Sequence, residues 1–269
     1  MTLEFCSFAS SSSGNCYPVR SENTTLLVDV GVAGKHVLAG LDAKGSSIEA
    51  VDGILLTHEH IDHVKSLRMM SRKAVNAGVY ASKGTLSQVC DKITDDVMRP
   101  VCAQTPFSIG DIEVRPFALS HDAAEPLSYS FCKDGRQITV VTDTGHMTEE
   151  AFDQLKEADL LVLESNHEVN ILKMGAYPYS VKRRILGDEG HLSNETAGKC
   201  LCEILKYRRE QGRTEVPKVV LAHLSKENNT PGQAYLTIRN VLFEEDFYID
   251  KDLELDIALR DEIGKSVEI

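Results

Sequence analysis

Short apolar runs separated by polar and turn-forming residues recur along the whole chain. Runs of about four to eight apolar residues between such breaks are typical of buried strands. They predict strands at Leu3–Phe8, Thr24–Asp29, Gly53–Thr57, Ile112–Leu119, Ile138–Thr142, Leu160–Glu164, Val219–Ala222 and Leu253–Ala258. We expect the first three of these strands to form a meander.

Segments with apolar residues at helical spacing lie between the strands. They predict helices at Lys65–Ala77, Gly84–Ile93, Glu149–Ala158, Glu195–Gln211 and Gln233–Phe243. Thr148 is expected to cap the third helix, whose first turn carries Glu149 and Glu150. Strands that alternate with helices favour a layered α/β architecture in which helices cover stacked sheets. We expect a single domain over residues 1–269, because no linker, repeat or low-complexity tract divides the chain.

The composition is that of an ordinary globular protein, with 42% hydrophobic and 26% charged residues. No run approaches the roughly 18 apolar residues of a membrane span, and the first residues lack the pattern of a signal peptide. The seven cysteines form no CxxC pair and lie mostly in apolar runs. They predict reduced core thiols in a cytoplasmic protein without a membrane partner.

The formal net charge of −12 argues against tight nonspecific binding of DNA or RNA, since such binders are usually basic. It does not argue against a nuclease. Bound divalent cations and a local basic rim can receive phosphates on an acidic protein.

The strongest chemical signal is a group of polar residues at the end of the predicted strand Gly53–Thr57. His58, His60, Asp62 and His63 fall within six positions. A turn into a helix can direct one pair of these side chains at one metal ion and the other pair at a second. Imidazole and carboxylate are the ligands expected for zinc, manganese or iron.

This stretch, His58-Glu-His-Ile-Asp-His63, resembles the HxHxDH motif of the metallo-β-lactamase-fold hydrolases. The stretch Leu-Leu-Val-Asp29-Val-Gly31 is similar to the early strand and turn of that superfamily. The resemblance covers nearly the whole chain. It implies a four-layer αββα sandwich with a two-metal cleft along one edge.

The resemblance also implies the remaining ligands, each at the end of a predicted strand. His121 follows Val114–Ser120, Asp143 lies in Val-Val-Thr-Asp-Thr-Gly145, and His223 follows Val219–Ala222. In such enzymes the counterparts of His58, His60 and His121 hold one divalent ion. Those of Asp62, His63 and His223 hold the other, and Asp143 bridges the two. Asp62 is further expected to orient the attacking hydroxide.

Every expected ligand is nitrogen or oxygen, which is typical of the phosphodiesterase and nuclease branches. Five further stretches resemble the WalJ/YycJ (VicX) subfamily, whose members are regarded as 5′-to-3′ DNA exonuclease-like. They are Phe8–Asn15, Ser120–Ala123, Glu164–His167, Gly190–Asn194 and Ala222–Asn229. The chain has no room for the clamp domain of the larger ribonucleases of this fold, which disfavours long or structured RNA.

Several polar residues outside the ligand set are candidates for contact with substrate. His191 is expected to protonate the leaving oxygen or to hold the phosphate, with helix capping as the alternative. The remaining candidates are Ser12, Ser13, Asn15, His167, Ser225, Lys226 and Asn228. A turn is the alternative for the three in the Ser10–Asn15 stretch. The basic run Lys182–Arg184 is expected to be a solvated helix face.

The preferred function is hydrolysis of phosphodiesters in nucleic acid. We expect exonucleolytic cleavage of DNA by a hydroxide that two divalent ions activate. A phosphodiesterase for cyclic or nucleotide phosphates fits the acidic charge equally well. A lactam or thioester hydrolase is a weaker alternative. A metal-bearing regulatory protein without turnover belongs to a different class. The sequence leaves the oligomeric state open.

Overall fold

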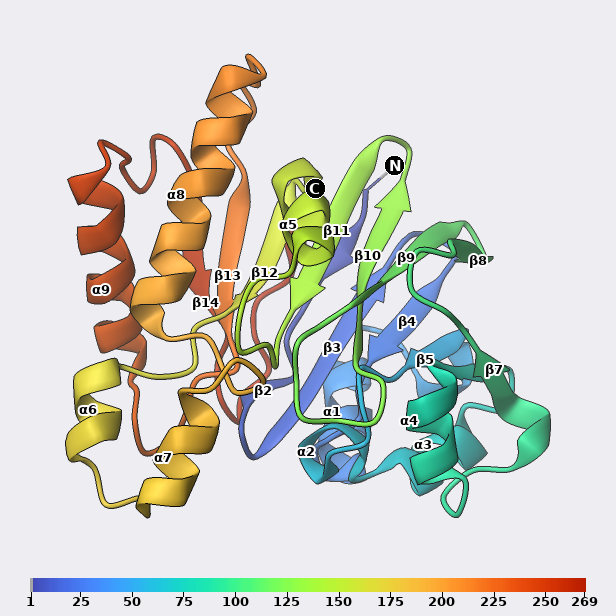
Figure 1. Ribbon diagram of the computed structural model, residues 1–269. Coiled ribbons are helices and arrows are strands. Elements are labelled where there is room, and N and C mark those ends of the chain that lie inside the picture. The colour runs from blue at the N-terminus through green and yellow to red at the C-terminus, as the bar shows by residue number, and fades with distance from the viewer. Residues whose placement is uncertain (1) are drawn as a thin grey trace. The chain divides into compact units, whose positions relative to one another are not determined.

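The computed structural model describes residues 2–269, which group into two units (Figure 1). Unit 1 contains residues 2–118, 123–137 and 259–269, and unit 2 contains residues 119–122 and 138–258. Each unit therefore draws on segments that are separated in the sequence. The expectation of a single domain over residues 1–269 stays a prediction.

Unit 1 is built around an eight-stranded sheet. Its strands are β1 (Glu4–Phe5), β2 (Ala9–Ser11), β3 (Gly14–Arg20), β4 (Thr25–Val28), β5 (Gly53–Leu55), β6 (Gly78–Ala81), β7 (Met98–Pro100) and β15 (Val267–Glu268). The order is β15-β1-β3-β4-β5-β6-β7, and β2 pairs with β3. The pairs β4–β5, β5–β6 and β6–β7 are parallel, whereas β3 and β4 are antiparallel.

The expected meander is wrong, because β4 and β5 are parallel and must be joined by a crossover. That crossover contains helix α1 (Gly34–Ala43), whose helical spacing is weak because Gly34 and Gly40 are among its buried residues. The predicted strands near β1, β4 and β5 are themselves confirmed, with ends shifted by a few residues.

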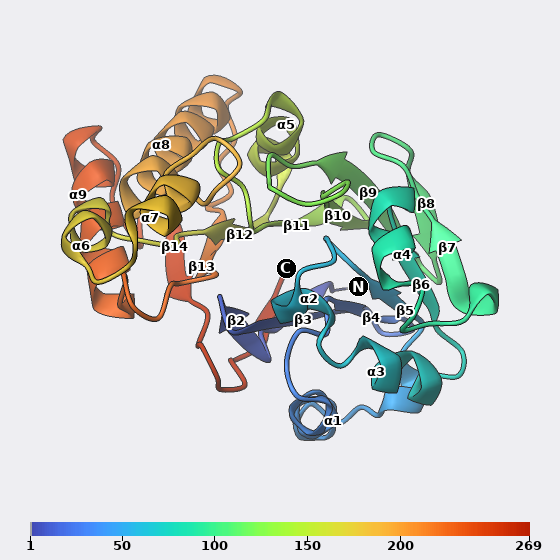
Figure 2. The same ribbon diagram turned by 60° about the horizontal axis from the view of Figure 1, so that its bottom comes forward.

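Helices and a second group of strands cover the two faces of this sheet. The helices are α1, α2 (Ile61–Val64), α3 (Leu67–Lys73) and α4 (Lys83–Val89), with short 3-10 turns at Ile48–Ala50 and Asp95–Val97. Figure 2 shows α1 and α3 on one face. On the other face lie the antiparallel strands β8 (Phe107–Ile109), β9 (Ile112–Ala118) and β10 (Leu127–Lys133). There the Tyr129 hydroxyl donates to the Leu56 carbonyl at 2.7 Å.

Unit 2 is a parallel arrangement of β11 (Arg136–Val141), β12 (Leu160–Glu164), β13 (Lys218–Ala222) and β14 (Glu254–Ile257). Its helices are α5 (Glu149–Glu157), α6 (Val169–Met174), α7 (Tyr179–Ile185), α8 (Asn194–Glu210) and α9 (Pro231–Glu244). Figure 2 shows α5, α8 and α9 on one face of these strands. Residues 160–163 of β12 are fully buried, as expected for a strand in the middle of a parallel sheet.

The predicted mixed α/β architecture with two sheets is confirmed. The predicted cap is also confirmed, because the Thr148 side chain accepts a hydrogen bond from the Ala151 backbone N–H. Among the helices of residues 2–269, none is long and apolar enough to cross a membrane.

Gly31 should be intolerant of any side chain. A Cβ at this position would lie 1.5 Å from the backbone oxygen of Asp62, so Gly31→Ala must displace the loop that carries the polar motif. We expect urea unfolding followed by circular dichroism to show a loss of about 3 kcal/mol or more. Gly45→Ala is the matched control. It has a φ of +66° with nothing within 4 Å and should cost only about 1 kcal/mol. Equal losses would contradict the packing argument.

Candidate metal centre

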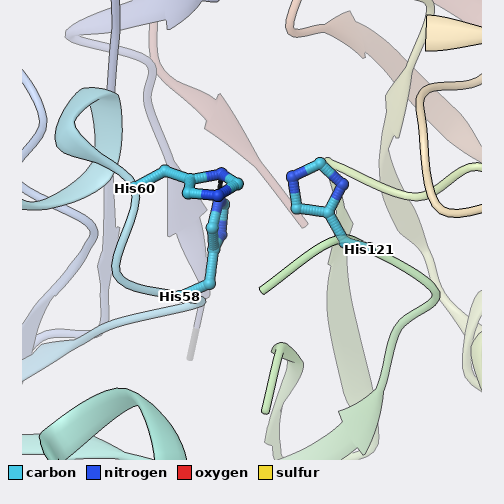
Figure 3. A group of neighbouring side chains, drawn as sticks. All are labelled: His58, His60 and His121. Atoms are coloured by element: carbon cyan, nitrogen blue, oxygen red, sulfur yellow. Dashed lines mark hydrogen bonds between the residues drawn. The ribbon is translucent and has the colours of Figure 1, made fainter. Parts of the chain in front are cut away.

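In unit 1, the loop after β5 brings the four motif residues together in two pairs. The Nε2 atom of His58 lies 2.9 Å from Nδ1 of His60, and Figure 3 shows these two rings meeting edge to face. The Nε2 atom of His63 lies 3.6 Å from a carboxylate oxygen of Asp62. His58 and His63 are buried, whereas His60 and Asp62 are partly exposed. His58 and His63 are neighbours as well, with ring centroids 4.1 Å apart, and binding of two metal ions by the two pairs stays a prediction.

A buried carboxylate that the site prediction omitted supports this loop. Asp29 accepts hydrogen bonds from the backbone N–H and the hydroxyl of Thr57, each at 2.9 Å. Its other contact is Nδ1 of His63 at 2.8 Å. A histidine held at Nδ1 by a carboxylate keeps Nε2 in a fixed direction, which is the usual support for a metal-binding imidazole. Asp29 has a positive φ of 59° just after a strand. This backbone conformation cannot be recognised from the sequence.

The hairpin of β2 and β3 places the serine-rich stretch beside His63. Ser12 and Ser13 form its exposed turn. Asn15 is buried, and its side chain exchanges two hydrogen bonds with the backbone of Ser11. The Asn15 amide nitrogen also lies 3.2 Å from Nε2 of His63. Asn15 therefore shapes the turn, and contact of these residues with substrate stays a prediction.

In unit 2, His121, Asp143 and His223 lie at the ends of strands and converge. One carboxylate oxygen of Asp143 lies 3.9 Å from Nε2 of His121 and 3.4 Å from Nε2 of His223. Asp143 and His223 have positive φ values, 59° and 56°, that are uncommon outside glycine. Nδ1 of His121 is 3.2 Å from the Gly190 carbonyl, and its Nε2 faces the carboxylates of Asp122, at 3.5 Å, and of Asp143. Figure 3 also labels His121, in the loop after β9.

Glu164 stands behind these histidines and was not among the predicted site residues. Its Oε1 lies 2.9 Å from Nδ1 of His191 and 2.9 Å from Nδ1 of His223. Its Oε2 accepts from the backbone N–H groups of Thr144 and Leu192. Glu164 is fully buried at the end of an apolar strand, so its pattern in the sequence is that of a strand end rather than of a site.

Two opposing effects act on the pKa of Glu164, and the contacts with histidines together have the larger effect. Burial alone raises the pKa of this carboxyl group, but the contacts with His191 and His223 lower it to about 2. For His121, burial lowers the pKa below the usual 6.5, which favours the neutral imidazole that binds metals. His191 lies beside these residues and is partly exposed, with its Nδ1 3.6 Å from a carboxylate oxygen of Asp143.

The remaining candidates are in unit 2. His167 is 1% exposed, and among the described residues neither of its ring nitrogens has a hydrogen-bond partner. Ser225 and Asn228 are buried, and the Ser225 hydroxyl accepts from the backbone N–H and the side chain of Asn228. Lys226 is exposed. Contact of any of these four with substrate stays a prediction.

The donor sets within each unit fit divalent metal ions. Two nitrogens bound to one tetrahedral ion at about 2.1 Å each lie about 3.4 Å apart, so the 2.9 Å between His58 and His60 requires only a small separation of the rings. In unit 2, Asp143 and His223 offer oxygen and nitrogen atoms at a comparable spacing of 3.4 Å. The Nδ1 atoms of His63, His121 and His223 already have other contacts, so Nε2 is the atom each offers to an ion.

The fold agrees with that of known metallo-β-lactamase fold proteins. Residues 24–210 match a family model described as a beta-lactamase superfamily domain. YhfI of Bacillus subtilis, a metallo-β-lactamase fold protein of known structure, aligns with a TM-score of 0.73 over 100% of each chain. The identity is 16%, so this likeness shows the fold alone. The predicted metallo-β-lactamase fold is confirmed.

Two curated relatives match nearly the whole chain. Exodeoxyribonuclease YycJ of Bacillus anthracis is 38% identical over 258 residues, which are 95% of this chain and 95% of the relative. Exodeoxyribonuclease WalJ of Streptococcus pneumoniae serotype 2 is 34% identical over 94% of this chain and 93% of its own. The chain thus belongs to the beta-lactamase superfamily, and within it to the family of YycJ and WalJ. The predicted family is confirmed.

The burial of His167 predicts a pH-dependent stability. Burial lowers the pKa of His167 to about 4, so between pH 6.5 and 4 the unfolded chain binds the proton that the folded chain excludes. The free energy of unfolding therefore falls as the pH falls through this window, by about 3 kcal/mol from this residue. We expect His167→Leu, which cannot bind a proton, to lose this part of the slope in urea unfolding of the chelator-treated protein. If the free energy of unfolding fell with pH equally in the wild type and in His167→Leu, His167 would not be held neutral in the folded protein.

Proposed function

We propose that this protein is a metal-dependent phosphodiester hydrolase that degrades DNA from its end in the 5′-to-3′ direction. The prediction of a nuclease-type hydrolase is supported by the exodeoxyribonuclease names of the two relatives. The substrate is therefore nucleic acid, and DNA rather than RNA is our proposal. We also propose a cytoplasmic location, in keeping with seven cysteines that form no disulfide in the described chain.

We propose two divalent ions, zinc, manganese or iron, held by the seven predicted ligands. These are His58, His60, Asp62, His63, His121, Asp143 and His223. The two ions, when bound, would supply a hydroxide nucleophile near neutral pH and positive charge at the phosphate.

The observation that carries the proposal is the position of Asp143 between two imidazoles. Its Oδ1 faces Nε2 of both His121 and His223. A carboxylate has two oxygens and can bridge ions, and it keeps the donor set entirely nitrogen and oxygen. Such hard ligands suit ions that work on phosphate oxygens.

The protein's own residues then orient the substrate and move a proton. Attack forms a new P–O bond at the scissile phosphate, and the bond to the departing sugar oxygen breaks. We propose that His191 donates the proton that this oxygen needs. Glu164 acts as a positioning residue, because its contact with Nδ1 of His191 directs Nε2 outward. Asp62 is proposed to orient the nucleophile.

The proposal is tested by offering purified protein, with manganese or zinc, duplex DNA, single-stranded DNA and RNA, each labelled at either end. Bis-p-nitrophenyl phosphate is included as a small diester. We expect 5′-labelled DNA to release a labelled mononucleotide at once and 3′-labelled DNA to give a descending ladder. Elemental analysis of the same preparation should approach two equivalents of metal, and Asp143→Ala should lose at least one.

Each other outcome identifies a different function. Immediate release of a 3′ label would reverse the polarity, and turnover of small diesters alone would favour a small-molecule phosphodiesterase. Hydrolysis of a β-lactam or thioester with every diester untouched would overturn the phosphodiesterase assignment. Protein with two metals and no turnover would point to the regulatory alternative. A metal content that stays at one equivalent in excess metal would contradict the two-ion proposal.

A variant of His191 distinguishes a role in proton donation from a purely structural role. His191→Ala should keep its metal content and thermal stability while kcat on DNA falls at least about tenfold, the low side of general acid catalysis. A diester with a p-nitrophenolate leaving group should be less affected, because that group departs without a proton.

His146→Ala is the matched control, since it removes an exposed histidine from the same unit and should keep the wild-type kcat. Equal losses on the two substrates would assign His191 to phosphate binding. Unchanged turnover would return it to a structural role.

A further inference from the structure

Helices α6 and α7 form a basic segment in an acidic protein. The α6–α7 segment, residues 169–186, contains Lys173, Lys182, Arg183 and Arg184 and no Asp or Glu, although the net charge of the chain is −12. Figure 1 shows these two helices, in yellow, at one end of unit 2. Phosphates of an approaching strand would find here a local excess of positive charge.

The same segment exposes large apolar side chains. Met174 and Tyr179 are 83% and 78% exposed, and Ile171, Val181 and Leu186 are also exposed. Such a concentration of exposed apolar surface is typical of an interaction site. Aromatic side chains beside basic ones are the usual elements for binding single strands, because every base can stack on a ring.

Tyr179 and Arg183 line a hollow of about 760 Å³ on unit 2. They are one helical turn apart, so they lie on the same side of α7. Neither side chain makes a hydrogen bond or ion pair with another of the described residues. The volume lies in the range of small-molecule sites, roughly 300–1,000 Å³, which accommodates a nucleotide.

The hollow is lined by both basic and acidic side chains. The Arg184 guanidinium binds the Asp122 carboxylate through two hydrogen bonds, so these two charges compensate each other. Asp188 and Glu189 line the hollow too. Carboxylates accept hydrogen bonds from the exocyclic amino groups of bases, whereas Arg183 suits a phosphate. The lining therefore fits a nucleotide better than a bare phosphate.

A tightly packed loop connects the wall of the hollow to His191 of the proposed reaction site. Residues 187–190 connect α7 to His191, and the Asp122 backbone N–H donates to the Glu189 carbonyl. A Cβ on Gly190 would lie 2.3 Å from the carbonyl oxygens of Arg184 and Ile185, so the loop is tightly packed on the end of α7. Lys182 is a support rather than a contact, since its ammonium donates to the carbonyls of Lys173 and Gly175.

We propose that the hollow on α7 is a binding subsite for one nucleotide of a single-stranded DNA segment. Tyr179 stacks on the base, and Arg183 binds a phosphate. The subsite would hold the strand beside His191. This inference rests on the proposed nuclease function and adds a strand-binding site outside the metal ligands.

The test measures binding of fluorescein-labelled phosphorothioate oligodeoxycytidylate, which resists hydrolysis and carries an exocyclic amino group on every base, to the metal-loaded protein by fluorescence anisotropy. Tyr179→Ala should weaken binding at least about fivefold, the lower end of a stacking contribution, and Tyr179→Phe should stay near wild type. An abasic oligonucleotide should not distinguish Tyr179→Ala from wild type. Arg183→Glu should weaken binding of both oligonucleotides and reduce the salt dependence.

Arg239→Glu is the matched control, an equal charge change at an exposed position of α9. Equal effects of Arg183→Glu and Arg239→Glu would overturn the proposal in favour of general electrostatics. Normal binding by Tyr179→Ala in a protein that degrades DNA would overturn this subsite alone. A wild-type protein that neither binds nor degrades any nucleic acid would instead refute the proposed function. A dimer lost in Tyr179→Ala with DNA binding intact would reassign the surface to self-association.

Discussion

The carboxylate of Glu164 is the interaction on which the site of unit 2 depends. A charge in a protein interior is costly unless hydrogen bonds replace the water that it loses. Glu164 is fully buried, and two backbone N–H groups and the Nδ1 atoms of His191 and His223 surround its oxygens. The rings of His191 and His223 are therefore fixed in orientation, because the buried carboxylate needs their Nδ1 atoms as hydrogen-bond partners. Removing either partner leaves a buried group unsatisfied, so the two ring orientations are coupled.

Unit 1 uses the same device with different residues. Asp29 is buried behind His63 and takes the hydrogen bonds of Thr57. In both units a buried carboxylate fixes Nδ1 and leaves Nε2 for another atom. Asp29, Asp143 and His223 also share left-handed backbone geometry within two residues of the end of a strand. Such strain persists only where surrounding contacts hold it, and the hydrogen bonds around these three residues supply such contacts.

The sequence predicts the ligands better than their supports. His58, His60, Asp62 and His63 are recognisable because polar residues rarely follow a buried strand so densely. Glu164 and Asp29 are not, since each is a single acid ending an apolar run, and only the fold reveals its partners. The strand at Leu160–Glu164 is predicted to the residue because four successive apolar residues precede the acid that ends it. Helix α1 is missed because glycines on its buried face weaken the apolar stripe.

The acidic character of the chain and a nucleic-acid substrate are compatible because charge acts locally. At physiological salt, fields between exposed groups decay over about 8 Å, so a distant acidic face contributes little at a binding site. What matters for a strand is the charge within that distance of its phosphates. The α6–α7 segment carries four basic residues. Lys182 holds the segment together and Arg184 is paired with Asp122, which leaves Lys173 and Arg183 for phosphates. In the proposed arrangement, a strand therefore responds to the positive charge near α7 rather than to the net charge of the whole chain.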